Sequence, residues 1–452
     1  MTSAIETVLA NTKPLAYSKG ERLPLYVWAL NGMDTEDEGE IEDALRKLDR
    51  RGIALFATWN HQQETSLSEG LRIARAQKRL GLHVSINANH LLHRIFNGDP
   101  STAHIGEDGS SFFDLSFSKN VSMGCPFAVH HRFEEIGQRI ESFANAYQSA
   151  GIEIDVAFAD WEIDGPIEWN EAWAHSKRCV RCREAISDIE NFDTFQNSLR
   201  GIRAEIQHEV YAKILKNYFP NIRVGNYAEY PHNGERYWYD YFEHLPEYAP
   251  FLPDQKAKYR RWAQTFENTG FTFAMPVVYT WCPTFNWYNF KSSDYRWFYN
   301  MLLVGSNAAR AKTAPIGTFV HWHTTAPPQK LDPAVVQFSE EKYQTLLWHL
   351  LLRGHNTLFL WCRPPELAKE IQLVHEVYAQ AQQYGDFLDR GVPVTFDVPK
   401  TEGPVVSALR LDNQLLILRT DFTKAAEPVP LEVNGKTVAI PPSNTCQILP
   451  LP

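Results

Sequence analysis

Hydrophobic and polar positions follow a repeated order along the first 390 residues. Short, almost continuous apolar runs, such as residues 23–30 and 53–60, are typical of strands buried on both faces. Each run is followed by a stretch with apolar residues every third or fourth position, such as residues 67–80, which is typical of an amphipathic helix. The pattern predicts strands at residues 23–30, 53–60, 83–89, 154–162, 221–230, 271–280, 316–324 and 357–362.

Eight repeats of a strand and a helix predict an α/β fold, a (β/α)8 TIM-type barrel over residues 1–390. The alternative is an open doubly wound sheet, which does not need eight repeats; the sequence also lacks a Gly-x-Gly-x-x-Gly turn. Residues 391–452 carry short alternating runs separated by Asn-Gly and Pro-Pro, which predict a small antiparallel, β-sandwich-like module. We expect this module to be structural, with sugar binding as the alternative.

The composition narrows the class of function. The chain has 452 residues, and 44 basic against 54 acidic side chains give a net charge of −10. A general nucleic-acid-binding protein needs a basic surface, so we expect no nucleic-acid partner. No apolar run approaches the roughly 20 residues of a membrane helix, so we expect no membrane partner.

The start of the chain bears on where the protein works. Residues 1–13 have neither the basic start nor the apolar run of a secretory signal. The sequence as it stands therefore predicts a cytoplasmic protein, or a periplasmic or secreted one if a signal peptide has been removed.

The six cysteines are scattered, and only Cys179 and Cys182 are closely spaced. In a chain of this length such a distribution is not a disulfide framework. A Cys-x-x-Cys pair is half of a zinc site, for which His175 is a candidate further ligand, but no second pair is present. We therefore expect reduced thiols, no metal and no cofactor.

Aromatic residues gather where a barrel would carry its active site, at the carboxyl ends of the strands. Six tryptophans lie at or next to predicted strand ends: Trp28, Trp59, Trp161, Trp281, Trp322 and Trp361. Flat apolar rings stack on sugar faces, so we expect Trp28, Trp59, Trp281 and Trp361 to line a saccharide cleft. The alternative is that these rings only fill the mouth of the barrel. Asn89, after the third strand, is a further candidate substrate contact.

Two carboxylates end the fourth predicted strand. Asp160 and Glu162 are two residues apart, so in an extended strand they point to the same side. Repulsion should raise the pKa of one of them, which can then stay protonated and act as a general acid. The alternative is a solvated or ion-paired acidic segment.

A glycosidase with two carboxylates needs a second one across the cleft. The seventh strand ends in His321-Trp322-His323 without a carboxylate, and Glu229 after the fifth strand is a candidate by position only. The missing nucleophile favours a substrate-assisted mechanism, in which the 2-acetamido oxygen of the substrate attacks the anomeric carbon.

Several segments together resemble the hyaluronidase family of glycoside hydrolases. Asp160-Trp161-Glu162 resembles the Asp-Trp-Glu catalytic strand of that family, and residues 225–231 resemble its Gly-aromatic-Tyr-x-aromatic-Pro strand with one residue extra. Pro-Val-Val-Tyr at 276–279 is similar to Pro-Ser-Ile-Tyr, and Phe-Leu-Trp at 359–361 to Val-Leu-Trp. Leu-Tyr-Val-Trp at 25–28 resembles the opening Asn-Val-Tyr-Trp strand.

The resemblance implies a hydrolase of oligo- or polysaccharides that contain a 2-acetamido sugar. Carried over to this sequence, it makes Glu162 the proton donor and Asp160 the residue that orients the acetamido group. Tyr227 and Tyr279 would position that group, and Trp361 would form the wall of its pocket.

A basic segment bears on the charge of the substrate. Lys177, Arg178, Arg181 and Arg183 lie within a short stretch beyond the acid pair. They could bind a uronate or sulfate and so select an anionic glycan. The alternative is a solvated surface loop.

Other classes of function remain open. His321 and His323 could share a metal in a metal-dependent barrel hydrolase, with His90, His93 or Asp160 as further ligands. A two-carboxylate glycosidase on another polysaccharide, or a barrel that binds sugar without cleaving it, would have a similar sequence.

Overall fold

A computed structural model describes residues 3–33, 35–92, 95–96, 98–118, 120–161, 171–233, 235–237, 259–261, 265–325, 333–424, 427–443 and 445–451. The chain forms two compact units. The first comprises Met1–Leu30, Asp43–Leu55 and Ala274–Pro452, and the second comprises Asn31–Glu42 and Phe56–Phe273. Helix α2 (Glu38–Asp49) contributes residues to both.

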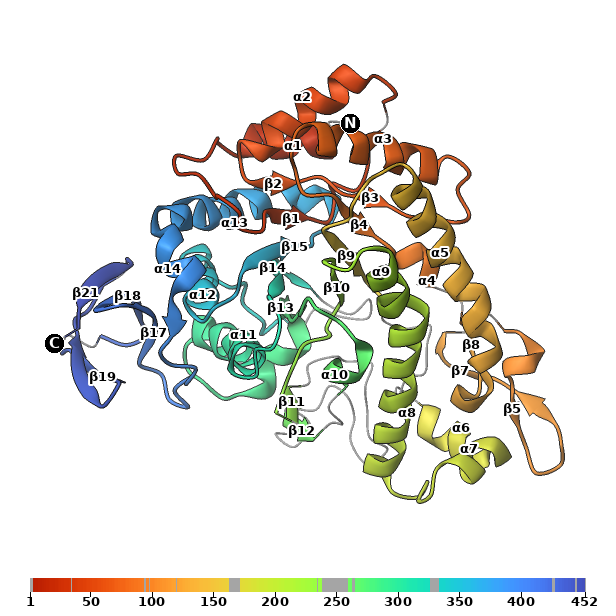
Figure 1. Cartoon of the computed structure of the whole chain (residues 1–452). Helices are drawn as coiled ribbons and strands as arrows, with labels where there is room; N and C mark the ends of the chain where they lie inside the picture. Colours follow the sequence, from red (N-terminus) through yellow and green to blue (C-terminus); the bar gives the residue numbers. More distant parts are fainter. Residues whose placement is uncertain are drawn as a thin grey trace. The chain divides into compact units, whose positions relative to one another are not determined.

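The first unit is built on a parallel sheet of five strands. Their order is β13 (Val277–Trp281), β14 (Gly317–Thr325), β15 (Thr357–Leu360), β1 (Leu25–Val27) and β2 (Ile53–Ala54). Strand β1 lies between β15 and β2, which brings an early and a late part of the chain side by side (Figure 1). All residues of β1, β2 and β15 are buried, as expected for parallel strands covered on both faces.

Helices alternate with these strands along the chain. The helices of the first unit are α1 (Ala4–Asn11), α11 (Ser293–Arg310), α12 (Glu340–Leu352), α13 (Leu367–Ala381) and α14 (Gly385–Arg390). Helix α11 follows β13, α12 follows β14, and α13 follows β15 after the short turn η7 (Pro364–Glu366). This is the strand-then-helix order that the apolar pattern predicts.

The second unit is built on a parallel sheet of four strands. Their order is β10 (Arg223–Asn226), β9 (Val156–Ala159), β4 (Ser85–Asn87) and β3 (Ala57–Thr58). Its helices are α3 (Ser66–Arg79), α4 (Asn89–Leu92), α5 (Phe133–Ser149), α6 (Ala172–Arg178), α7 (Val180–Ala185), α8 (Phe192–Gln207), α9 (Lys213–Tyr218) and α10 (Phe266–Thr269). Between α8 and α9 the helix widens into a π-turn at His208–Ala212.

Long segments between these elements carry short hairpins. Strand β5 (His104–Ile105) pairs with β6 (Ser111–Phe112), and β7 (Asp114–Ser118) pairs with β8 (Val121–Met123). Both hairpins lie between β4 and α5. A third hairpin, β11 (Glu235–Tyr237) with β12 (Tyr259–Arg261), follows β10.

Each strand predicted from the sequence contains an observed parallel strand or a parallel bridge. The predicted strand at 53–60 divides, because Ile53–Ala54 pairs with β1 and Ala57–Thr58 pairs with β4. The predicted strand at 271–280 also divides: Thr272 and Phe273 donate to the Val224 oxygen, and β13 pairs with β14. The fold is therefore α/β with two parallel sheets. The closed (β/α)8 barrel stays a prediction.

The C-terminal part is antiparallel, as predicted. Strands β16 (Val392–Pro393), β17 (Pro404–Leu411), β18 (Gln414–Asp421) and β21 (Gln447–Pro450) form one sheet. Strands β19 (Val429–Val433) and β20 (Lys436–Ile440) form a hairpin. The φ angles of Asn434 and Gly435, at 52° and 75°, suit the tight turn between them. The C-terminal module belongs to the first unit, and a domain boundary at residue 390 stays a prediction.

One buried arginine joins this module to helix α12. Arg353 is fully buried and donates to the Phe396 oxygen at 2.7 Å, the Asp397 oxygen at 2.9 Å and Ser407 Oγ at 2.8 Å. His349, one turn earlier, lies 2.7 Å from the same hydroxyl. These bonds support a structural role for the module. Among the described residues, no helix has the length and apolar character that crossing a membrane requires.

Candidate functional site

The backbone after β9 is held by polar side chains of the second unit. The Trp161 N–H donates to Asn226 Oδ1 at 2.9 Å, and Asn226 Nδ2 donates back to the Trp161 oxygen at 3.2 Å. Arg203 Nη2 donates to the same oxygen at 2.8 Å. Asp160, between β9 and Trp161, is therefore fixed at the carboxyl end of a parallel strand, where α/β enzymes carry their active sites.

Among the described carboxyl groups of the second unit, Asp160 has the largest shift in pKa. The residue is half-buried, and its Oδ1 is shielded from solvent without a hydrogen-bond partner among the described residues. Burial raises the pKa of Asp160 to about 7. The side chain can thus hold a proton near neutral pH and can accept a hydrogen bond from a ligand. Glu162 lies outside the described residues, so its place beside Asp160 stays a prediction.

Tyr227 and Glu229 follow the neighbouring strand β10. The Tyr227 N–H donates to the Ala159 oxygen at 2.9 Å, and the side chain is half-buried. Glu229 is 3 % exposed, and its Oε1 lies 3.7 Å from Arg203 Nε. A carboxylate held by a buried cation is a weaker nucleophile, so this ion pair favours a structural role for Glu229.

Two tryptophans at predicted strand ends of the second unit are core residues. Trp59 is fully buried, with its ring 5.3 Å from Phe143 and 5.2 Å from Tyr147, both on α5. The prediction that Trp59 lines a cleft is therefore wrong, because its side chain faces the covering helix. Trp161 is also buried, at 2 % exposure. Asn89 is buried too, and its Oδ1 has no hydrogen-bond partner in the described part of the chain.

The first unit brings two predicted site residues together. The rings of Tyr279 and Trp361 stack at 5.5 Å with an interplanar angle of 24°. His321 meets both rings edge-on, at 5.7 Å and 5.1 Å. Tyr279 and Trp361 are half-buried, as are Trp28 and Trp281 of the same unit. The unit thus holds a partly accessible aromatic cluster at the ends of β13, β14 and β15.

Two glutamates that the sequence analysis missed lie behind this cluster. His321 Nε2 lies 3.1 Å from Glu366 Oε2 and 3.4 Å from Glu370 Oε1, and His323 Nδ1 lies 2.7 Å from Glu370 Oε1. Arg363 Nε donates to Glu366 Oε1 at 2.8 Å. Although burial opposes ionisation, hydrogen bonds from His321 and Arg363 lower the pKa of Glu366 to about 2.

These four side chains could hold a metal ion, since their ligand atoms all lie within 4.8 Å of one another. Glu370 already accepts hydrogen bonds from the Trp322 N–H at 3.0 Å and the His323 N–H at 2.8 Å. Without a metal ion, the same four side chains form a charge-assisted hydrogen-bond network, and this network fixes the orientation of the His321 ring.

The ligands predicted for the histidine pair were His90, His93 and Asp160. His90 and Asp160 belong to the second unit, and His93 lies outside the described residues. The sequence signal for these two glutamates is their spacing of four residues. Glu366 is the last residue of η7, directly before α13, and Glu370 lies in the first turn of α13.

The basic segment has partners within the second unit. The Lys177 ammonium lies over the Trp173 ring, and the Arg178 guanidinium lies over the Phe112 ring. Arg181 contacts the Ala103 oxygen, and Arg183 contacts the Glu107 carboxylate. Arg181 and Arg183 make direct hydrogen bonds, at 3.2 Å and 2.7 Å. These contacts favour a structural role over a uronate site.

Comparisons with known proteins give distant similarities. No family model and no curated protein matches the chain. The β-galactosidase from Marinomonas ef1 is 13 % identical with a TM-score of 0.46, over 78 % of this chain and 60 % of its own. The α-L-fucosidase isoenzyme 2 from Paenibacillus thiaminolyticus is 11 % identical with a TM-score of 0.47, over 83 % and 51 %. Bee venom hyaluronidase is 13 % identical with a TM-score of 0.34, over 74 % and 99 %.

The chain spans 60 % and 51 % of the lengths of the first two of these structures. All three TM-scores are below 0.5, so these similarities assign no activity to the chain.

Proposed function

We propose that the chain is a glycoside hydrolase that cleaves an oligo- or polysaccharide beside a 2-acetamido sugar, in the manner of the hyaluronidase family. The observation that carries the proposal is the state of Asp160. It stands at the end of a buried parallel strand with a shielded Oδ1 that lacks a partner among the described residues, and burial raises its pKa to about 7. Such perturbed carboxyls mark candidate catalytic sites.

In the proposed reaction Asp160 Oδ1 accepts the acetamido N–H of the substrate. The acetamido oxygen attacks the anomeric carbon as the glycosidic C–O bond breaks, and Glu162 gives its proton to the leaving oxygen. Ionised Asp160 stabilises the positive charge of the oxazolinium ring. Water then attacks the anomeric carbon and gives its proton to Glu162, while the bond between that carbon and the acetamido oxygen breaks and restores the acetamido group. The two inversions at the anomeric carbon retain its configuration.

Two aromatic groups are proposed as substrate contacts. The stacked Tyr279 and Trp361 rings form a half-buried aromatic platform, and we propose that the outer face of one ring packs on a sugar. Tyr227, fixed through its N–H at the end of β10, is proposed to donate to the acetamido oxygen.

The test compares matched glycosides that carry a 2-acetamido or a 2-hydroxyl group. We expect turnover of the 2-acetamido substrate only, inhibition by a thiazoline mimic, and a loss of roughly 10²-fold or more in kcat for Glu162→Gln. Equal cleavage of the 2-hydroxyl sugar, or a trapped glycosyl adduct on Glu229, would replace the mechanism by a two-carboxylate one. Sugar binding without turnover of any glycoside would instead support a non-catalytic barrel.

A second candidate is a metal-dependent hydrolase, favoured by the closeness of His321, His323, Glu366 and Glu370. In that case His323→Gln should abolish both activity and the metal that supports it. A glycosidase of the proposed kind should keep most of its turnover in this variant.

A further inference from the structure

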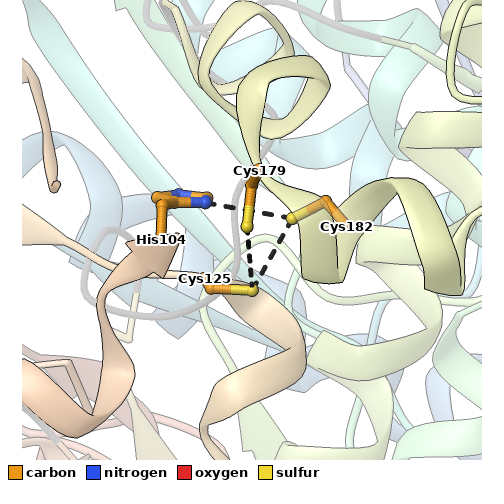
Figure 2. A group of neighbouring side chains, drawn as sticks. All are labelled: His104, Cys125, Cys179 and Cys182. Carbon is orange, nitrogen blue, oxygen red and sulfur yellow. Dashed lines mark hydrogen bonds between the residues drawn. The ribbon is translucent and has the colours of Figure 1, made fainter. Parts of the chain in front are cut away.

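Three cysteines and one histidine of the second unit converge on one point. Figure 2 shows the sulfur atoms of Cys125, Cys179 and Cys182 facing one another, with the ring of His104 beside them. All four residues are buried, and their ligand atoms lie within 4.8 Å of one another. We infer that these residues form a structural zinc site.

The distances fit a tetrahedral ion. The sulfur of Cys125 lies 3.6 Å from that of Cys182 and 3.9 Å from that of Cys179, and Cys182 Sγ lies 3.9 Å from His104 Nδ1. Thiolates at about 2.3 Å from zinc in a regular tetrahedron are about 3.8 Å apart, and a nitrogen at about 2.0 Å is about 3.5 Å from each sulfur. The observed edges match these values to within about 0.4 Å. Bonded sulfurs would be about 2.0 Å apart, so the cluster is not a disulfide.

The backbone presents these ligands without further rearrangement. Cys179 lies between α6 and α7 and Cys182 is in α7, so their spacing is the Cys-x-x-Cys step common in zinc sites. The Cys125 N–H donates to the Thr102 oxygen at 2.7 Å, two residues before His104. The histidine of the site is thus His104.

His175, the histidine that the sequence analysis placed beside the cysteine pair, is engaged elsewhere. Its Nδ1 lies 2.9 Å from the Glu171 oxygen and 3.6 Å from Asp114 Oδ1.

The charge of the surroundings also suits the site. A Zn²⁺ ion with three thiolates has a net charge of −1. The positively charged Arg181 and Arg183, on either side of Cys182 in the sequence, suit this negative charge. Arg181 donates to the Ala103 oxygen, next to His104, at 3.2 Å.

A zinc ion at this site would cross-link two long segments of the second unit. His104 and Cys125 come from the segment between β4 and α5, and Cys179 and Cys182 from the segment between β9 and α8. The apolar core around the thiols is small, and small cores are often completed by a metal. Four buried protein ligands leave no open position, which is the mark of a structural and not a catalytic zinc.

The test is metal analysis of the full-length chain, free of any histidine tag, after expression with Zn²⁺. We expect about one zinc per chain and an X-ray absorption spectrum with sulfur neighbours at about 2.3 Å and a nitrogen at about 2.0–2.1 Å in a ratio of three to one. This measurement uses the unmodified protein, so it does not depend on the folding of a variant.

Variants then locate the ion. Cys125→Ser and Cys182→Ser should lose most of the zinc, whereas Cys446→Ser, outside the cluster, should keep it. A chain that stays zinc-free after incubation with ZnCl₂ would overturn the proposal. So would a spectrum with only nitrogen and oxygen neighbours, or zinc that is lost in His323→Gln and retained in Cys182→Ser.

Discussion

The raised pKa of Asp160 makes a prediction about stability that does not require the substrate. The substitution Asp160→Asn keeps the size of the side chain and removes its charge. Burial raises the pKa of Asp160 from the ordinary value of 3.8 to about 7, so the folded state keeps a proton that the unfolded chain has released. The contribution of this proton to stability is complete below the unfolded pKa and is lost as pH rises toward and through the folded pKa.

The size of the effect follows from the shift. With pKa values of 3.8 unfolded and about 7 folded, ionisation of Asp160 lowers the free energy of unfolding of the wild type by about 2 to 3 kcal/mol between about pH 5 and pH 8. The Asn variant has no such loss. Its free energy of unfolding, relative to the wild type, should therefore increase by that amount across the same interval.

Urea unfolding of both chains at several pH values measures this difference. Subtracting one chain from the other removes the groups that titrate alike in both. Asp108→Asn is the matched control: hydrogen bonds from Ser110 lower the pKa of Asp108, so it is ionised throughout and its curve should run parallel to the wild type. A difference for Asp160→Asn that stays constant, or that falls as pH rises, would mean that Asp160 is ionised in the folded protein and would refute the reasoning.

Further predictions concern the pH profile, the aromatic platform and the buried arginine. If ionised Asp160 supports the reaction, kcat/KM should fall as pH drops below about 7, whereas a decline above that pH would make Asp160 the acid. Trp361→Ala should lower kcat/KM roughly tenfold through lost stacking, measured on the 2-acetamido glycoside. Arg353→Ala should cost about 3 kcal/mol or more in thermal unfolding, because it leaves buried oxygens without donors; the exposed Arg310→Ala should change stability by less than about 0.5 kcal/mol.

The parallel strands could be predicted because strands buried on both faces must be apolar throughout. Because such strands lack alternation, two structural features could not be predicted: where the strand predicted at 53–60 divides, and which way Trp59 points. Residues 53–57 are apolar without a break, so nothing in them marks the change from β2 to β3. A run without alternation also gives no sign of which way Trp59 points, and that side chain faces α5.

The sequence indicated candidate site residues mainly at strand ends. Asp160, Tyr279 and Trp361 are such candidates, and their roles stay predictions. Glu366 and Glu370 belong to the turn and helix after β15, and their role depends on the histidines that they contact across the fold. Position along a strand carries no information about such partners.

The cysteine cluster is a second case in which local spacing does not reveal contacts between distant segments. It also indicates how long connecting segments can be stabilised. Cys125 and Cys179 are separated by 54 residues, so their meeting is invisible to local spacing. Closing a loop of this length costs about 4 kcal/mol of chain entropy, whereas a structural zinc contributes about 10–16 kcal/mol in small domains. A zinc at this point would therefore offset the ordering of both segments by a wide margin. Its removal should loosen the segments between β4 and α5 and between β9 and α8 first, and leave the parallel sheets folded, which limited proteolysis with and without a chelator would reveal.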